Sequence, residues 1–400
     1  MKRWRAVLAP GAIAGAILWT LVASAAALAG QNGATKVEER SWPKLMLGPT
    51  DRVLVLAPHP DDEVLGCGGV IQQAMALGLP LRIVFLTYGD FYEQSFIRYE
   101  KRPVLTPRGV EGMGEIRRRE ALVADATLGA PAADLVFLGY PDFGTLKMWY
   151  SAWDGARPVR GMLSRATAVP YRDARRPGAP YKGDEVLKDL TAILREFGPT
   201  KVFVSHPADH HPDHKALYLF ARVALFDVAP EIAPRVYPYL VHHTKWPVPS
   251  GAHPAAPLEP TVFLKDRIPW EVVALDERQV RIKGDALQKH KTQYETTPGF
   301  LDSFVRRNEL FGDFPPIALS GSAAPPPASV SRESEGLSPV AHEEQAYLVG
   351  VVTWTAKIEG ASLVFSIRLS RSLAREVGCS VYLFGSRGGT PFLRCRNSAS

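Results

Sequence analysis

Short, continuously apolar runs alternate along the first half of the chain with longer segments whose apolar residues recur at helical spacing. Continuous apolar runs rich in β-branched residues are typical of strands buried on both faces. These runs lie at residues 52–58, 81–90, 134–142 and 201–207. The helical segments lie at residues 62–78, 112–130, 183–200 and 211–226. The alternation predicts an α/β fold with a doubly wound, mostly parallel sheet that helices cover on both faces.

A long stretch after the third predicted strand, residues 143–183, shows neither period. Loops of this length in compact domains are usually functional or disordered. Its aromatic residues support two interpretations: they form the rim of a sugar-binding cleft, or they pin the loop to the body of the domain. They are Trp149, Tyr150, Trp153 and Tyr171.

The C-terminal part has a different pattern. Residues 315–344 are rich in Pro, Ala and Ser, which is the composition of a linker. Residues 345–400 then alternate apolar and polar positions, which predicts a small antiparallel β unit. This unit carries no cluster of acids and histidines, so its role is not predicted. Its expected strands lie at residues 346–358, 362–370 and 379–385.

Residues 1–29 have the features of a secretory signal peptide in their usual order. Basic residues come first, an apolar run follows, and Ala27-Leu28-Ala29 gives a small-x-small cleavage pattern before Gly30. The sequence therefore predicts export to the periplasm or the cell exterior, with residues 30–50 as a polar lead-in. The apolar run is also long enough to span a bilayer, so a retained membrane anchor is the alternative.

Composition and charge exclude one class of partner and add expectations for the cysteines. The 400 residues are 46% hydrophobic and 22% charged, as in an ordinary globular protein. The net charge of +6 comes from scattered basic residues, so we expect no nucleic-acid partner. Cys379 and Cys395 could pair in an oxidising compartment, whereas Cys67 is expected to be a small buried apolar residue. The oligomeric state stays open.

Charged side chains gather directly after the first predicted strand. His59, Asp61, Asp62 and Glu63 stand together where that strand gives way to a helix. Adjacent carboxylates repel one another and resist desolvation, so their grouping there indicates a bound cation. The nearby run Gly66-x-Gly68-Gly69 is too degenerate, and lies too far inside the helix, to indicate a dinucleotide.

A second cluster follows the fourth predicted strand. His211 and His214 are three residues apart at a helix start, so both can project from one face. Parallel strands bring their carboxyl ends to one edge of the sheet, where α/β domains bind ligands. The two clusters are therefore expected to build one site. The second cluster contains His206, Asp209, His210, His211, Asp213 and His214.

His59, Asp62 and His214 make a two-histidine, one-carboxylate set, and catalytic zinc typically takes three protein ligands. Asp61 and Asp62 point different ways in a turn, so one can bind the metal while the other addresses its water. The same ligands accept iron or cobalt. Each part also has a plain structural interpretation, as a hydrogen-bonded strand-end histidine or as acids at a helix start.

The segment PHPDDEVLGCGG (residues 58–69), followed far downstream by HPDH (residues 211–214), resembles the PIG-L/LmbE-like zinc-dependent N-deacetylases. The resemblance covers about residues 51–314 and implies the Rossmann-like sheet of the LmbE type. TYGD, RRREALVADATLG and FLGYPDFG also resemble the family's strand ends and its Arg-x-x-Glu helix. LQKHKTQY and RRNELFG resemble its closing helical segment.

The resemblance implies a role for each matching residue of the two main motifs. His59, Asp62 and His214 would be the zinc ligands, and Asp61 would be the general base. His211 would stabilise the oxyanion as a cation or hydrogen-bond donor and help the amine leave. Asp213 would orient His211 from behind.

The lesser matches imply substrate contacts. Arg117 would bind substrate, and Asp142 would lie near the sugar. Some family members carry a tyrosine where this chain has Asp209, so a tyrosine contribution to the oxyanion is not expected here.

The resulting hypothesis is an exported zinc amidohydrolase that removes the acetyl group from an N-acetylglucosamine-type sugar or glycan. One alternative is a zinc amidase for a non-sugar acylated amine. Another is a glycan-binding protein with an inactive inherited site. A metal-stripped and zinc-restored assay would separate turnover from binding.

Overall fold

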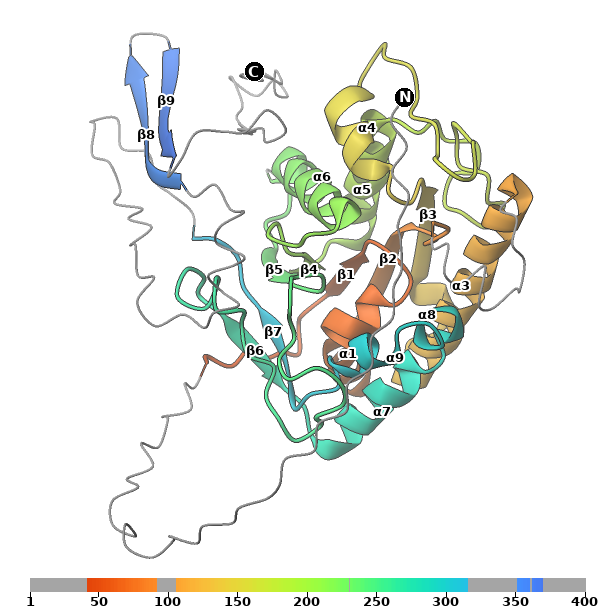
Figure 1. Cartoon of the computed structure of the whole chain (residues 1–400), viewed down its shortest axis with the longest axis vertical. Coiled ribbons are helices and arrows are strands. Elements are labelled where there is room, and N and C mark those ends of the chain that lie inside the picture. The colour runs from red at the N-terminus through yellow and green to blue at the C-terminus, as the bar shows by residue number, and fades with distance from the viewer. Residues whose placement is uncertain (1–41, 92–105, 230, 316–350, 360–361, 370–400) are drawn as a thin grey trace, which may run out of the picture. The chain divides into compact units, whose positions relative to one another are not determined.

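Five parallel strands form the central sheet in the order β3-β2-β1-β4-β5 (Figure 1). The computed structural model describes residues 42–91, 106–229, 231–315, 351–359 and 362–369. β1 lies in the middle of the sheet and all its residues are buried, as its continuous apolar run predicts. The strands are β1 (Val53–Ala57), β2 (Leu81–Thr87), β3 (Leu135–Tyr140), β4 (Lys201–Ser205) and β5 (Arg235–Tyr239).

The four strands predicted from the apolar runs are confirmed, and β5 is an addition. Its sequence, RVYPY, is interrupted by Pro238, which lacks the N–H that a central strand needs. β5 pairs with β4 at the edge of the sheet, where a proline is tolerated. Its short, interrupted apolar pattern hid it from sequence analysis.

Helices lie on both faces of the sheet, so the predicted α/β class is confirmed. One layer holds α1, α3 and α7, which contact one another, and the other holds α4, α5 and α6 (Figure 1). A short 3-10 helix, η1 (Ala132–Asp134), precedes β3. The bounds are α1 (Asp62–Ala76), α3 (Pro107–Leu128), α4 (Thr145–Ser151), α5 (Gly183–Phe197), α6 (Pro212–Val228) and α7 (Glu277–Leu287).

The closing segment differs from the helix that the resemblance implied for RRNELFG. Residues Asn308–Phe311 form a strand, β7, that pairs antiparallel with β6 (Glu271–Ala274). The short helices α8 (Lys291–Tyr294) and α9 (Pro298–Asp302) precede it. The strand is favoured because Leu310 and Phe311 enter the core while the backbone completes the pairing with β6.

The long stretch at residues 143–183 is not irregular throughout, because it contains α4. Its aromatic residues pin it to the domain. Trp149 and Trp153 are partly buried and pack edge-on or tilted against Phe220 of α6. Tyr171 is buried and stacks on Tyr88 with ring centroids 3.7 Å apart. Its hydroxyl donates a hydrogen bond to the Asp90 carboxylate. For these three residues the pinning interpretation fits the structure.

A buried ion pair ties α1 to the closing segment. Lys283 Nζ lies 2.7 Å from Glu309 Oε1, and both side chains are only 1% exposed. Lys283 also donates to the Leu65 carbonyl, while the Glu309 carboxylate accepts from the Gly69 and Val70 N–H groups. Leu65 C=O and Gly69 N–H are four residues apart, the spacing of an α-helical hydrogen bond. The pair therefore braces the middle of α1 from outside the helix.

Several predictions lie outside the described residues. They are the signal peptide at 1–29, nearly all of the linker, the Cys379–Cys395 pairing and the third C-terminal strand. The first two C-terminal strands form an antiparallel hairpin of β8 (Val351–Glu359) and β9 (Ser362–Leu369). Cys67 is buried and unpaired, as expected of a small core residue. Within the described ranges, no helix has the length and apolar character needed to cross a membrane.

Candidate active site

The loops that follow β1, β3, β4 and β5 contribute polar side chains to one cluster. The chain winds from β1 outward to β3, then returns to build β4 and β5 on the other side of β1. The carboxyl ends of β1 and β4 therefore flank the point where the winding reverses, which is where such sheets bind ligands. The two predicted clusters follow these two strands and meet there.

Asp61 occupies a strained position at the start of α1. Its φ of 124° is a conformation that non-glycine residues rarely adopt. Its backbone N–H donates to Glu63 Oε2 at 2.8 Å, and Glu63 Oε1 lies 3.1 Å from His290 Nε2. Glu63 and His290 are fully buried. The loop that carries Asp61 is therefore held by residues that take no other visible part in the site.

Arg117, predicted to bind substrate, is buried against the same loop. Its guanidinium donates to the carbonyls of Pro60 and Gly89 at 2.6 and 2.7 Å. It also lies 3.4 Å from Asp61 Oδ2. With 4% of its surface exposed, Arg117 is placed to fix the Asp61 loop. A substrate role stays a prediction.

The electrostatic surroundings of Asp61 keep its proton affinity high. Burial raises the pKa of Asp61, the Arg117 charge lowers it, and the neighbouring Asp62 raises it, giving about 7. Asp62 behaves oppositely: although burial alone would raise its pKa, His214 and His59 hold it well below the ordinary range. The two adjacent carboxyl groups thus differ in charge preference because they face different partners.

His59 and His214 both contact the same oxygen of Asp62, Oδ2. His59 Nδ1 lies 3.0 Å from this oxygen, and His214 Nε2 lies 3.1 Å from it. The other nitrogen of His214, Nδ1, lies 3.1 Å from Asp209 Oδ2. Burial alone would lower the pKa of His214, but Asp209 and Asp62 raise it to about 9. Asp209 stands behind His214 as an outer carboxylate.

The donor atoms of this cluster fit a divalent metal ion. Both ring nitrogens of His214 are buried and lack a hydrogen bond within the described part of the chain, although each faces a carboxylate oxygen. Imidazole nitrogens and carboxylate oxygens are the ligand types that zinc takes. Two groups of donors that lie within 4.8 Å of one another include this histidine: His59, His211 and His214; and Asp62, His214 and His242.

The second ring nitrogen of His59 faces two further carboxylates. Nε2 lies 3.2 Å from Asp142 Oδ1 and 3.3 Å from Asp213 Oδ2. Asp142 also accepts from the Phe91 N–H, and Asp213 accepts from the Phe143 N–H and from Thr145. Asp142 is predicted to lie near the sugar; in the structure it is buried behind His59.

His211 is the N-cap of α6, and its Nδ1 accepts a hydrogen bond from the Asp213 backbone N–H. The backbone N–H of Asp213, rather than a hydrogen bond from the ring to its carboxylate, therefore fixes the ring. The Asp213 carboxylate lies within 4.8 Å of a His211 ring nitrogen, in a shared group of donor atoms. Burial and the neighbouring His59 and His214 lower the pKa of His211 to about 2. A neutral ring whose Nδ1 accepts must carry its hydrogen on Nε2.

Sequence analysis missed two contributors to the site. His242 follows β5, and its ring lies with centroids 4.8 Å from His214 and stacks on Phe300. Burial lowers the pKa of His242 to about 4, so the ring is neutral and able to bind a cation. Phe143 follows β3 and lies beside His211. Neither residue neighbours an acid-and-histidine run, so only the location after a strand could have suggested His242.

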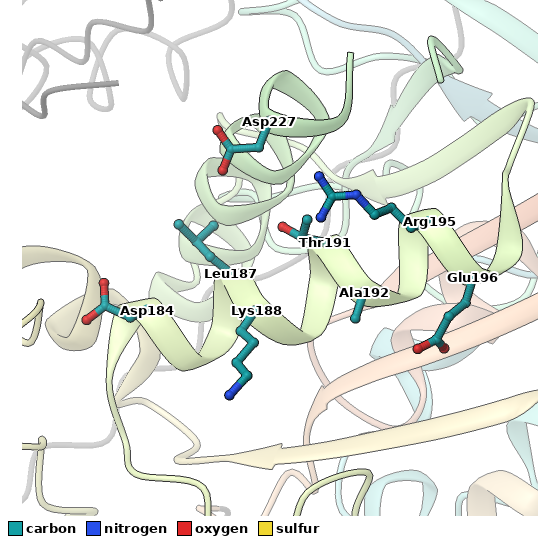
Figure 2. Close-up of a pocket in the computed structure, with 8 residues that line it drawn as sticks. All are labelled: Asp184, Leu187, Lys188, Thr191, Ala192, Arg195, Glu196 and Asp227. Carbon is teal, nitrogen blue, oxygen red and sulfur yellow. The ribbon is translucent and has the colours of Figure 1, made fainter. Parts of the chain in front are cut away.

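A separate pocket lies on the outer surface of α5 and α6 (Figure 2). None of the residues discussed above lines it. Its lining combines acids, bases and short apolar side chains, without histidine. These residues are Asp184, Leu187, Lys188, Thr191, Ala192, Arg195, Glu196 and Asp227.

Comparison with known proteins finds matches to one family. Residues 54–225 match the profile of the PIG-L family, described as GlcNAc-PI de-N-acetylase. A 1D-myo-inositol 2-acetamido-2-deoxy-alpha-D-glucopyranoside deacetylase of Gordonia bronchialis is 26% identical over 270 residues, which cover 64% of this chain and 89% of the relative. The resemblance predicted from the two motifs is confirmed.

Two further similarities are weaker. A deacetylase of the same description from Saccharopolyspora erythraea is 33% identical over 167 residues, covering 41% of this chain and 50% of the relative. The solved N,N'-diacetylchitobiose deacetylase of Pyrococcus horikoshii aligns with 65% of this chain and 82% of its own, at 22% identity and a TM-score of 0.41.

Proposed function

We propose that this chain, whose residues 54–225 form a PIG-L-family domain, hydrolyses the acetamide of an N-acetylglucosamine-type sugar or glycan. The observation that carries the proposal is the meeting of His59, Asp62 and His214 at one carboxylate oxygen, with Asp61 adjacent. Relatives named as deacetylases of a 2-acetamido-2-deoxy-glucopyranoside support the substrate class.

His59, Asp62 and His214, which contact one another through Asp62 Oδ2, would hold the metal ion, zinc in the first instance. His242 shares a group of close donor atoms with Asp62 and His214. When bound, zinc supplies a Lewis acid for the amide carbonyl and lowers the pKa of water from 15.7 to about 7. Asp209 keeps the His214 ring in place from behind. The proton transfers of the reaction are then assigned to side chains of this chain.

Asp61 accepts the proton of the attacking water as the new C–O bond forms. Arg117 and Glu63 hold its loop, so the carboxylate meets the water without reorganising. His211 donates from Nε2 to the carbonyl oxygen as negative charge develops there. The C–N bond then breaks, and the proton taken by Asp61 passes to the departing nitrogen. The products are acetate and a free amine.

Export remains a separate proposal that rests on residues 1–29 alone. A mature chain that begins at Gly30, found by N-terminal sequencing of the secreted protein, supports cleavage and export. A chain that keeps its first residues and stays with the membrane supports the anchor instead.

Free-amine release from a panel of N-acetylated sugars tests the reaction. The full-length chain is stripped of metal with a chelator and then assayed before and after zinc is restored. We expect amine from at least one N-acetylglucosamine-type compound only after zinc is added. Release from non-sugar acylated amines alone would replace the substrate class. Tight zinc binding without any release would favour a binding protein.

Asp209→Asn is expected to weaken metal binding by roughly 10–100-fold, the usual effect of losing an outer-shell partner. The change removes the negative charge 3.1 Å from His214 Nδ1 and keeps the shape of the side chain. A competition titration with a chromophoric chelator measures the affinity. His214→Ala, which removes a ligand, should have a larger effect.

The matched control is Asp51→Asn. Asp51 is a buried carboxylate that bonds Thr200 and Lys201 at the amino end of the sheet, away from the cluster. Its replacement should leave metal affinity unchanged. An unchanged affinity in Asp209→Asn would show that His214 needs no support from Asp209.

A further inference from the structure

Phe143 combines backbone strain with an exposed aromatic ring. Its φ of 54° places a bulky residue in the left-handed region, which such side chains rarely occupy. Its side chain is nevertheless 39% exposed. Among the large exposed apolar residues of the described chain, Phe143 alone has a positive φ. Backbone strain that serves no core packing is often found at binding sites.

The buried Asp213 carboxylate holds Phe143 in this conformation. Asp213 Oδ2 accepts the Phe143 N–H at 2.6 Å, and Oδ1 accepts the Thr145 N–H at 3.1 Å. The same Oδ2 lies 3.3 Å from His59 Nε2. The strained residue is therefore fixed to a group that also contacts a predicted metal ligand.

Four rings form a continuous row that leads outward from the predicted metal ligands. Ring centroids are 4.6 Å apart between His59 and His211, 4.3 Å between His211 and Phe143, and 4.8 Å between Phe143 and Phe91. His59 is buried, His211 and Phe91 are half-buried, and Phe143 is exposed. The Phe91 N–H is held by Asp142, the other carboxylate behind His59. Both phenylalanines thus have fixed backbones.

We propose that Phe143, supported by Phe91, is the platform on which the pyranose ring of the substrate lies. The inference rests on the proposed function and names the group that binds the sugar next to the reacting amide. The acetamide nitrogen is bonded directly to the sugar ring, so a substrate at His211 has its ring within reach of Phe143. The C–H groups of a pyranose face are apolar and pack on an aromatic face.

Phe143→Gly is the most informative variant, because glycine adopts a positive φ freely and removes only the ring. Phe143→Tyr keeps an aromatic face as the conservative comparison. Met162→Ala, which truncates another exposed apolar side chain, is the matched control. Thermal unfolding and metal content are measured for all variants. Metal content should match that of the unmodified chain, and the unfolding temperature should equal or exceed the value for that chain.

Binding is measured by saturation-transfer NMR titration of the metal-loaded full-length protein with two probes. Methyl N-acetyl-glucosaminide carries the ring, and N-acetylethanolamine carries the same acetamide without a ring. Phe143→Gly is expected to weaken binding of the sugar by roughly five- to tenfold, the range of a single aromatic contact. It should leave the ring-free amide unaffected, and Phe143→Tyr should bind like the unmodified chain.

Kinetics give a second readout. With an N-acetylated sugar as substrate, Phe143→Gly should raise KM by the same factor and change kcat little, because the ring contact is uniform binding. Equal sugar affinity in Phe143→Gly and the unmodified chain would overturn the proposal, as would equal loss with both probes. Absence of turnover with a preserved difference in sugar binding would contradict the proposed reaction and keep the platform.

Discussion

Asp61→Asn is expected to lower kcat by roughly 10²–10⁴-fold while leaving metal content unchanged, since this is the usual contribution of a general base. Asparagine has the shape of aspartate and is tolerated at positive φ better than most residues, so the loop at φ 124° should persist. It cannot take a proton from water. Amine release under saturating substrate, with zinc content measured on the same sample, gives both numbers.

The control for this change is Asp125→Asn. Asp125 is also fully buried, and burial together with the nearby Glu63 carboxylate raises its pKa well above the usual range, which favours the neutral carboxyl. It lies on α3, and its oxygens lack hydrogen-bond partners in the described chain. Its replacement should leave kcat unchanged. Turnover of Asp61→Asn at the unmodified rate would show that another group takes the proton, and loss of zinc would make Asp61 a ligand.

Lys283→Met is expected to destabilise the fold by about 3–5 kcal/mol, because it leaves the Glu309 carboxylate buried without its cation. The side chains of Lys283 and Glu309 are each 1% exposed. The pair braces α1, whose N-terminal turn carries Asp62. Urea unfolding measures the change as a lower midpoint at an unchanged slope. The variant should keep its activity at urea concentrations where it is still folded, because Lys283 contacts none of the predicted metal ligands in the described structure.

An exposed ion pair on α7, the helix that carries Lys283, provides the comparison. Arg281 and Glu277 are 68% and 97% exposed and lie 3.8 Å apart. Arg281→Met should therefore change stability by no more than about 0.5 kcal/mol. A change below about 1 kcal/mol in Lys283→Met would mean that the Gly69 and Val70 N–H groups alone satisfy Glu309.

The sheet was predictable because each central strand is buried on both faces and so leaves a continuous apolar run. The edge strand β5 and the strand β7 lack such a run. β5 contains Pro238, and β7 is stabilised by pairing with β6 and by the Glu309 contacts. Sequence patterns report burial, and these two strands depend instead on which backbone lies beside them.

The candidate site likewise has parts that local sequence predicts and parts that depend on tertiary packing. The sequence by itself determined the contiguous pieces: His59 with Asp61 and Asp62, and His211 with His214, each group spanning four residues of the chain. Local spacing fixes such neighbours, because a few residues of backbone leave little freedom.

Only the tertiary structure decided how distant segments complete the site. Phe143, His242 and His290 follow other strands or helices, and each reaches the cluster across a long separation in sequence. Their side-chain directions depend on packing and on buried carboxylates such as Asp213, which hold backbone conformations that no local preference selects. Packing and buried hydrogen bonds couple residues that the sequence keeps apart, and that coupling appears only when the chain has folded.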